Sequence, residues 1–225
     1  MNELEFYNID LEEISDVLVK AESSFNIKFK KNELAQITTF GQLCDHISNK
    51  IQLSHTEDCT TQQAFYKLRE ALAAALQIDK QTILTDTTLD SLLPRKNRRS
   101  TIKKTEQHLG FNLNLLRPSH WLSGTLAVLF LASLVALFFN WQIGLFGLVG
   151  TATALWLAHK TGKEMDLLTV GELAEIMTRE NYMKVRRNPT TVNKTEIEKV
   201  LTDLFSNDLS LDKSKLTREA KFVKR

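Results

Sequence analysis

Two cysteines and two histidines form the densest group of metal-binding residue types in this sequence. They are Cys44, His46, His55 and Cys59, and zinc can be bound tetrahedrally by two residues of each type. Their spacing matches no standard zinc finger, however. Cys44 falls on an inward position of an amphipathic helix, where a free cysteine is commonly buried. We therefore expect no bound metal.

Patterns that support catalysis are missing from the sequence. No glycine-rich phosphate-binding loop, no Ser/His/Asp arrangement and no pair of carboxylates stands out. The sequence therefore predicts that the protein is not an enzyme.

Basic side chains crowd one short segment in the middle of the chain. This basic segment contains Arg95, Lys96, Arg98, Arg99, Lys103 and Lys104. Near a bilayer, each such charge attracts anionic headgroups by about 1 kcal/mol. A second cluster, Lys184, Arg186 and Arg187, fits lipid binding and a solvated helix face equally well. The net charge of +2 is nearly balanced, so we expect no nucleic-acid partner.

Two uncharged apolar runs lie between residues 121 and 158. The first reads WLSGTLAVLFLASLVALFF from Trp121, and the second reads IGLFGLVGTATALWLA from Ile143. A helix needs about 20 apolar residues to cross the ~30 Å core of a bilayer, and only helices satisfy the backbone of such a hairpin in lipid. Two core helices of a soluble protein would keep a polar face, which these runs lack. The sequence predicts a two-helix transmembrane hairpin at 121–158.

The residues that flank the hairpin predict its orientation. Arg117 precedes it, and Lys160 and Lys163 follow it, whereas the connection NWQ carries no charge. Positive residues favour the cytoplasmic side, so we expect both termini in the cytoplasm. The run begins too far along the chain to be a signal peptide. The two cysteines fit a reducing compartment.

Three glycines spaced three apart lie in the second apolar run. Gly144, Gly147 and Gly150 put small residues on part of this helix. Small residues let transmembrane helices approach closely, either within the hairpin or against another protomer. We favour packing within the hairpin.

The sequence outside the hairpin contains two pairs of similar segments. FNI at 25–27 is followed by TFGQL at 39–43, and FNL at 111–113 is followed by TVGEL at 169–173. Both TxGxL segments open an amphipathic helix. The second spacing is much longer than the first, and the hairpin accounts for the excess. The hairpin is therefore an insertion into one loop of a repeated unit.

A second pair of similar segments spans 64–89 and 196–222. The two align at Asp79 and Asp212, and each begins as an amphipathic helix and ends in a loop that contains threonine.

This succession of helices and loops resembles that of an acyl carrier protein. In that family, a four-helix bundle presents a serine within an Asp-Ser-Leu motif at the start of its second helix, and this serine carries 4′-phosphopantetheine. The resemblance covers nearly all of the chain outside the hairpin, and ITTFGQL, which ends at residue 43, carries it best.

Transfer of the family motif to this sequence leaves the attachment position without a hydroxyl. The serine would fall at Leu11, after Asp10, in one unit and at Asn97 in the other. Attachment through a phosphate ester needs an oxygen nucleophile, which neither residue has. Asp90-Ser91-Leu92 matches the motif but lies about six residues too early. We expect no cofactor, and phosphopantetheine on Ser91 is the alternative.

The charge of the central helix also departs from the family. That helix is typically acidic in carrier proteins and docks on basic enzyme surfaces, whereas here the equivalent stretch begins with the basic segment. Long-range attraction then favours an acidic protein partner, such as a genuine carrier protein, or anionic lipid headgroups.

The order of the repeated segments predicts an unusual domain arrangement. Residues 60–182 form one carrier-like bundle, which the hairpin at 121–158 interrupts. Residues 1–52 and 194–225 form the other bundle if the chain ends meet, as in a circular permutation. Alternatively, these halves complete units between neighbouring molecules, which gives a homo-oligomer.

The sequence thus predicts an all-α protein with acyl-carrier-like four-helix bundles and an inserted two-helix transmembrane hairpin. The expected function is that of a non-catalytic scaffold or recruitment protein at the cytoplasmic membrane face. An active carrier that bears an acyl group on Ser91 for lipid or pigment synthesis is the alternative.

Overall fold

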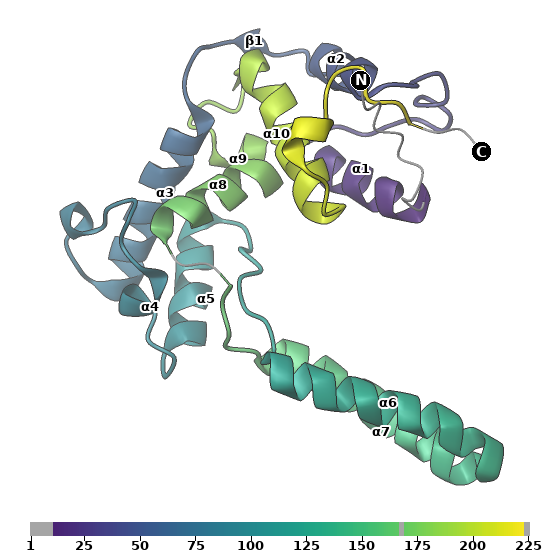
Figure 1. The fold of residues 1–225 in the computed structure, drawn as a ribbon. Coiled ribbons are helices and arrows are strands. Elements are labelled where there is room, and N and C mark those ends of the chain that lie inside the picture. Colours follow the sequence, from purple (N-terminus) through teal and green to yellow (C-terminus); the bar gives the residue numbers. More distant parts are fainter. Residues whose placement is uncertain (1–10, 167–168, 223–225) are drawn as a thin grey trace. The chain divides into compact units, whose positions relative to one another are not determined.

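The computed structural model describes residues 11–166 and 169–222, which are mostly helical (Figure 1). Two compact units divide the chain. Unit 1 contains Met1–Glu70 and Gly171–Arg225, and unit 2 contains Ala71–Val170. Unit 1 therefore takes residues from both halves of the chain, and unit 2 is continuous.

Unit 1 contains most of the short helices. Its elements are α1 (Leu11–Phe25), α2 (Phe40–Lys50), β1 (Ser54–His55), the first part of α3 (Thr60–Leu76), α8 (Val170–Glu180) from its second residue, α9 (Tyr182–Val185), β2 (Thr191–Val192), α10 (Lys194–Asp208) and η2 (Lys213–Lys215). The two-residue strands β1 and β2 pair in parallel. The described residues are otherwise mostly helical, which agrees with the predicted all-α class.

The core of unit 1 joins α1, α2, α9 and α10. Phe40 of α2 meets Phe205 of α10 edge to face, with 5.3 Å between ring centroids, and Phe25 of α1 lies 5.2 Å from the ring of Tyr182. All four side chains are at most 2% exposed. Burial of each such ring stabilises the fold by about 1.5–3 kcal/mol. Segments from opposite ends of the chain thus share one hydrophobic core.

Backbone hydrogen bonds also join residues 38–41 to residues 218–222 within unit 1. The Phe40 N–H donates to the carbonyl of Ala220 at 2.8 Å, and the Phe222 N–H donates to the carbonyl of Thr38 at the same distance. Gly41 lies so close to Arg218 that a Cβ on it would be 2.8 Å from the Arg218 backbone oxygen. The C-terminal segment therefore runs directly beside the start of α2.

Unit 2 contains the rest of α3 and the hairpin. Its other elements are η1 (Lys80–Thr82), α4 (Leu89–Leu92), α5 (Arg98–Leu109), α6 (His120–Phe139) and α7 (Trp141–Thr161). Ile83, Leu89 and Leu93 are at most 1% exposed. These three apolar residues fix the loop that leads from η1 into α5.

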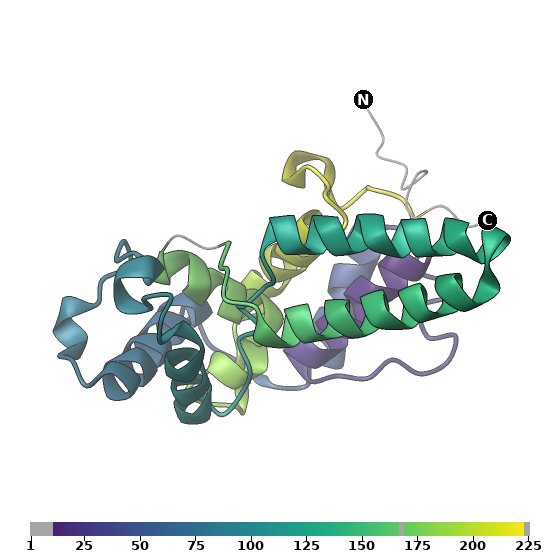
Figure 2. The same cartoon turned by 90° about the horizontal axis from the view of Figure 1, so that it is seen from below.

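The helices α6 and α7 lie antiparallel and side by side (Figure 2). Asn140 separates them, and its side chain caps α7 by accepting from the N–H groups of Gln142 and Ile143. A Cβ on Gly147 would lie 2.4 Å from Ser133 Oγ, so the helices touch at this glycine. Gly144 makes a similar approach to α6, whereas nothing lies near Gly150. The predicted packing within the hairpin is confirmed for the first two glycines and is wrong for the third.

Both hairpin helices are long and apolar enough to cross a membrane, as predicted. A core helix of a soluble protein would be mostly buried. None of the most apolar 18-residue stretch of α6 is buried, and only 11% of the corresponding stretch of α7 is. Large side chains such as Trp121 and Phe138 are 87% and 89% exposed. Contiguous exposed apolar surface of this kind marks a surface that contacts a membrane or another protein.

Similar local hydrogen bonds occur in the two units. Asp79 caps η1 and Asp212 caps η2, each by accepting from the backbone N–H two residues further on. Just before these caps, Gln77 and Ser210 both have positive φ angles, of 58° and 52°. The helices α3 and α10 thus end in the same way.

The short backbone bridges in the two units also correspond. Thr169, before α8, bridges to Thr88. Thr39, before α2, bridges to Lys221. The residue before each TxGxL helix is therefore joined to the chain that follows an Asp-capped 3-10 turn.

The correspondence between FNI and FNL is shifted by two residues. The helix α1 ends at Phe25, whereas α5 ends at Leu109, two residues before Phe111. In each helix a glutamate accepts from the backbone N–H seven residues further on; these are Glu22 and Glu106. Phe25 therefore corresponds to Leu109, and its alignment with Phe111 was wrong.

Candidate functional site

The candidate site lies at the start of α5, where the basic segment begins. The short helix α4 ends at Leu92, and Pro94 follows its last cap residue, which prevents α4 from continuing into α5. Asn97 is the N-cap residue of α5 but makes no side-chain cap hydrogen bond. Asn97, the position at which the resemblance predicts the attachment serine, is thus at the start of α5.

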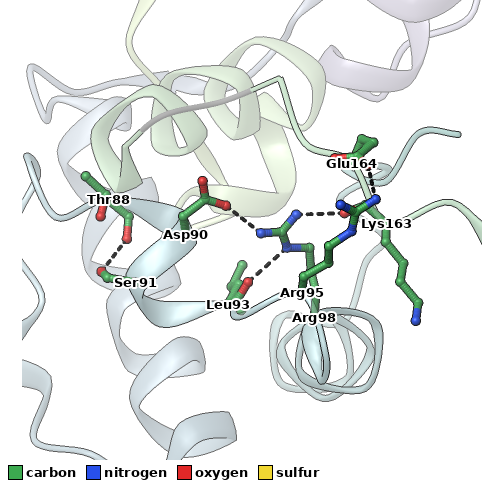
Figure 3. Close-up of polar contacts among 8 residues, drawn as sticks. All are labelled: Thr88, Asp90, Ser91, Leu93, Arg95, Arg98, Lys163 and Glu164. Atoms are coloured by element: carbon green, nitrogen blue, oxygen red, sulfur yellow. Dashed lines mark hydrogen bonds and ion pairs between the residues drawn. The ribbon is translucent and has the colours of Figure 1, made fainter. Parts of the chain in front are cut away.

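Arg98 anchors this helix start from within the fold (Figure 3). Its side chain is 7% exposed, its Nε donates to the carbonyl of Leu93 at 2.9 Å, and its Nη1 donates to the carbonyl of Lys163 at 2.7 Å. Its Nη2 pairs with Asp90 at 2.5 Å, although that carboxylate is 80% exposed. A single guanidinium therefore joins α4, α5 and the segment that returns from the hairpin.

Fewer residues of the basic segment are available for an interaction than the six that were predicted. Arg98 is buried, so its inclusion in an exposed face was wrong. Arg95 is exposed but forms an ion pair with Glu164. The remaining four, Lys96, Arg99, Lys103 and Lys104, are exposed, and no ion pair of theirs occurs among the described residues. These four form the exposed basic face, with Lys96 in the turn before α5 and the other three on α5.

A cleft of about 650 Å³ opens on one side of this face. Its walls come from α5 and from the segment 110–116 that follows it, and they include Arg99, Lys103 and Glu106. The rest of the lining mixes apolar side chains, among them Phe111 and Leu115, with the amides of Gln107, Asn112 and Asn114. The cleft therefore combines positive charge with an apolar surface.

The two ends of the hairpin are fastened together beside this region. The Arg117 N–H donates to the carbonyl of Glu164 at 3.0 Å, and the Glu164 N–H donates back at 3.1 Å. The Arg117 guanidinium also pairs with Asp166 at 3.1 Å. A Cβ on Gly162 would lie 2.4 Å from the Arg117 carbonyl, so only glycine fits there. Sequence reasoning missed these contacts, although two acidic residues soon after a hairpin flanked by Arg117 were a usable signal.

Ser91 lies in α4 and not at the start of α5. Its side chain is exposed, and its hydroxyl donates to the carbonyl of Thr88 at 2.7 Å (Figure 3). The hydroxyl is thus accessible but is six residues from Asn97 in sequence. Leu11 is the first residue of α1. Asp10, which would replace the family's aspartate, lies outside the described residues.

The cysteines and histidines of the first half do not gather around a point. Burial raises the pKa of the Cys44 thiol to about 12, whereas Cys59 is exposed. His46 Nε2 lies 2.8 Å from Glu33, and His55 Nδ1 accepts from the Lys194 N–H at 3.2 Å. Among residues 11–166 and 169–222, no group of three or more His, Cys, Asp and Glu side chains is placed to hold a metal.

The second basic cluster is not a continuous solvated face. Arg186 is 4% exposed, its Nη1 donates to the Thr60 hydroxyl at 2.7 Å, and its Nη2 donates to the hydroxyls of Thr56 and Thr191. Neither the lipid-binding nor the solvated interpretation holds for this residue. Sequence reasoning missed the three threonines, of which Thr56 and Thr60 lie more than a hundred residues before Arg186.

No family model, curated protein or solved structure matches this chain.

Proposed function

We propose that this protein is a membrane-anchored, non-catalytic scaffold that recruits a partner to the cytoplasmic face of a membrane through carrier-like helical bundles. The observation that carries this proposal is the exposed apolar hairpin, whose ends are joined by the Arg117–Glu164 bridge. A hairpin with paired ends leaves and re-enters unit 2 at one place. If it spans the bilayer, unit 1 and unit 2 are on the same side.

The carrier-like part of the proposal is supported by the features that recur in the two units. The caps Asp79 and Asp212 and the bridges at Thr39 and Thr169 occupy corresponding places. The proposal of an unmodified protein is supported by Asn97 at the start of α5. An amide cannot act as the oxygen nucleophile for a phosphate ester.

Recruitment is proposed to use the exposed basic face at and just before α5. Four cations on a face with no described ion pair attract an acidic partner and raise the rate of encounter. A carbodiimide, which joins lysine amines to carboxylates without a spacer, tests this in membranes. We expect cross-linked adducts of the full-length protein that disappear when Lys96, Arg99, Lys103 and Lys104 are changed to glutamate. Adducts unchanged in this variant would contradict the proposal.

Anchoring is tested with a variant in which residues 118–163 are replaced by a short glycine-containing turn. The Arg117–Glu164 bridge brings the two cut ends together, so a turn suffices to connect them. The full-length protein should stay in the membrane after carbonate extraction, and the variant should be soluble with unchanged helix content outside the hairpin. Release of the full-length protein by carbonate would contradict membrane anchoring.

An active carrier is the second candidate, because Ser91 is exposed within an Asp-Ser-Leu sequence. Incubation with a phosphopantetheinyl transferase followed by intact-mass measurement separates the two candidates. The scaffold proposal predicts no mass increase. An increase by one phosphopantetheine that is lost in Ser91→Ala would establish the carrier instead.

A further inference from the structure

We propose that the cleft between α5 and residues 110–116 binds the headgroup of one anionic phospholipid. This inference rests on the proposed function, because it requires that α6 and α7 lie in a bilayer. It goes further by assigning a specific site and a ligand class to two of the four exposed basic residues.

The charged wall of the cleft fits a phosphodiester. Arg99 and Lys103 are four residues apart in α5, so their side chains lie on the same helix face one turn apart. Glu106 adds one negative charge, but its Oε1 already accepts from the Leu113 N–H at 2.7 Å. Two cations therefore face one carboxylate that is held against the backbone. This leaves net positive charge toward an incoming anion.

The other wall of the cleft fits the start of an acyl chain. Its apolar part consists of Ile102 of α5 and Leu115, which are buried, and Phe111 and Leu116, which are half-buried; the amides of Gln107, Asn112 and Asn114 lie at the same cleft. A volume of about 650 Å³ lies in the range of small-ligand sites. A soluble anion such as inorganic phosphate would use only the charged wall. An amphiphile uses both walls, which favours a lipid.

Chain connectivity places the cleft close to the membrane surface. Leu116 lines the cleft, and α6 begins at His120. Four residues of extended chain span at most about 14 Å, and the headgroup regions extend about 5–8 Å beyond the hydrocarbon core. A lipid headgroup is therefore within reach of the cleft whenever α6 is inserted.

The structure offers a matched control close to the cleft, with Lys96 in the turn before α5 and Lys104 on another face of α5. Lys96 and Lys104 belong to the exposed basic face but do not line the cleft, whereas Arg99 and Lys103 do. The variants Arg99→Ala/Lys103→Ala and Lys96→Ala/Lys104→Ala remove the same charge. Diffuse attraction to anionic lipid would respond equally to both. A cleft site responds only to the first.

The test is native mass spectrometry of the full-length protein in detergent, titrated with short-chain phosphatidylglycerol. We expect one bound lipid at low concentration, and the cleft double variant should weaken this binding about thirty-fold, from the usual contribution of two basic residues. The control variant should change it less than three-fold. Arg99→Lys/Lys103→Arg, which keeps both charges, should restore most of the binding.

Several results would overturn the lipid site. One is that the two double variants weaken phosphatidylglycerol binding equally. Another is that phosphatidylcholine binds as tightly as phosphatidylglycerol. The third is that glycerophosphoglycerol, the headgroup without acyl chains, binds as tightly as phosphatidylglycerol. The last result would indicate a site for a soluble phosphodiester. If the protein resists carbonate extraction but shows one of these results, the anchoring proposal stands and the lipid site fails. Circular dichroism of each variant establishes that the fold is retained.

Discussion

Substitution of Arg98 tests the structural account of the candidate site, because one buried guanidinium joins three segments there. Arg98→Ala removes the donors to the carbonyls of Leu93 and Lys163. Each hydrogen bond that involves a charged group contributes about 1.5–3 kcal/mol. The pair with Asp90 adds little, since that carboxylate is 80% exposed. Water that enters the vacated space restores part of the loss. We therefore expect unit 2 to lose about 3 kcal/mol.

Hydrogen exchange followed by mass spectrometry suits this prediction because it resolves local stability in a detergent-solubilised protein. A loss of about 3 kcal/mol lowers protection roughly a hundred-fold. This should be seen in peptides that cover α5 and residues 162–166. Peptides of α2 and α10 should not change. Arg98→Lys should lose about half as much, because an ammonium cannot reproduce the guanidinium geometry.

Arg99→Ala is the matched control, since it removes the same side chain one residue away on the exposed side of α5. Its effect on protection should correspond to less than about 0.5 kcal/mol. If Arg98→Ala lowered protection no more than Arg99→Ala, Arg98 would not be an anchor and the described contacts would be refuted.

Three further predictions concern the hairpin and the core. Gly147→Ala should destabilise the hairpin by about 1–3 kcal/mol through overpacking, and Gly150→Ala should not. Tryptophan fluorescence can follow this change, because all three tryptophans lie within 121–156. Gly162→Ala should break the bridge at the base of the hairpin and speed hydrogen exchange there, and unchanged exchange would contradict the close approach. Burial raises the pKa of the Cys44 thiol from 9.0 to about 12. Above pH 9 the thiol therefore ionises only in the unfolded protein, so the free energy of unfolding should fall as the pH rises. If a Cys44→Ala variant showed the same pH dependence, Cys44 would not be its cause.

The hairpin was predictable because hydropathy and length are local properties of a sequence. The two apolar runs predicted helices at 121–158, and the structure has α6 and α7 there. The starts of α2 and α8 were predictable for a similar reason. Thr39 and Gln42 form a capping box, and such a box depends on residues only three positions apart.

The burial of Arg98 was not predicted, although the sequence contained its signal. Arg98, Ile102, Thr105 and Leu109 recur at helical spacing, and all are buried. This stripe was overlooked because the residues of the basic segment were selected by their charge and not by their helix face. A helical projection of α5 would have assigned Arg98 to the inward face.

The contacts of Arg186 were out of reach of sequence reasoning. Its hydroxyl partners Thr56 and Thr60 lie more than a hundred residues before Arg186 in the sequence. The third partner, Thr191, follows Arg186 by five residues and belongs to β2. Only the tertiary fold brings them together. The two-residue shift between Phe25 and Phe111 has a related cause, because short motifs fix residue types but not where a helix ends.

The most direct test of the central claim is labelling of single cysteines with a membrane-impermeant thiol reagent in intact cells. Gln142→Cys lies at the hairpin turn, Ser100→Cys lies on α5 of unit 2, and the native Cys59 lies in unit 1; all three positions are exposed. A hairpin that crosses the membrane twice, with both units in the cytoplasm, predicts that only Gln142→Cys reacts in intact cells and that the other two react after permeabilisation. If Gln142→Cys reacted only after permeabilisation, as Ser100→Cys and Cys59 should, the hairpin would not cross the membrane as proposed.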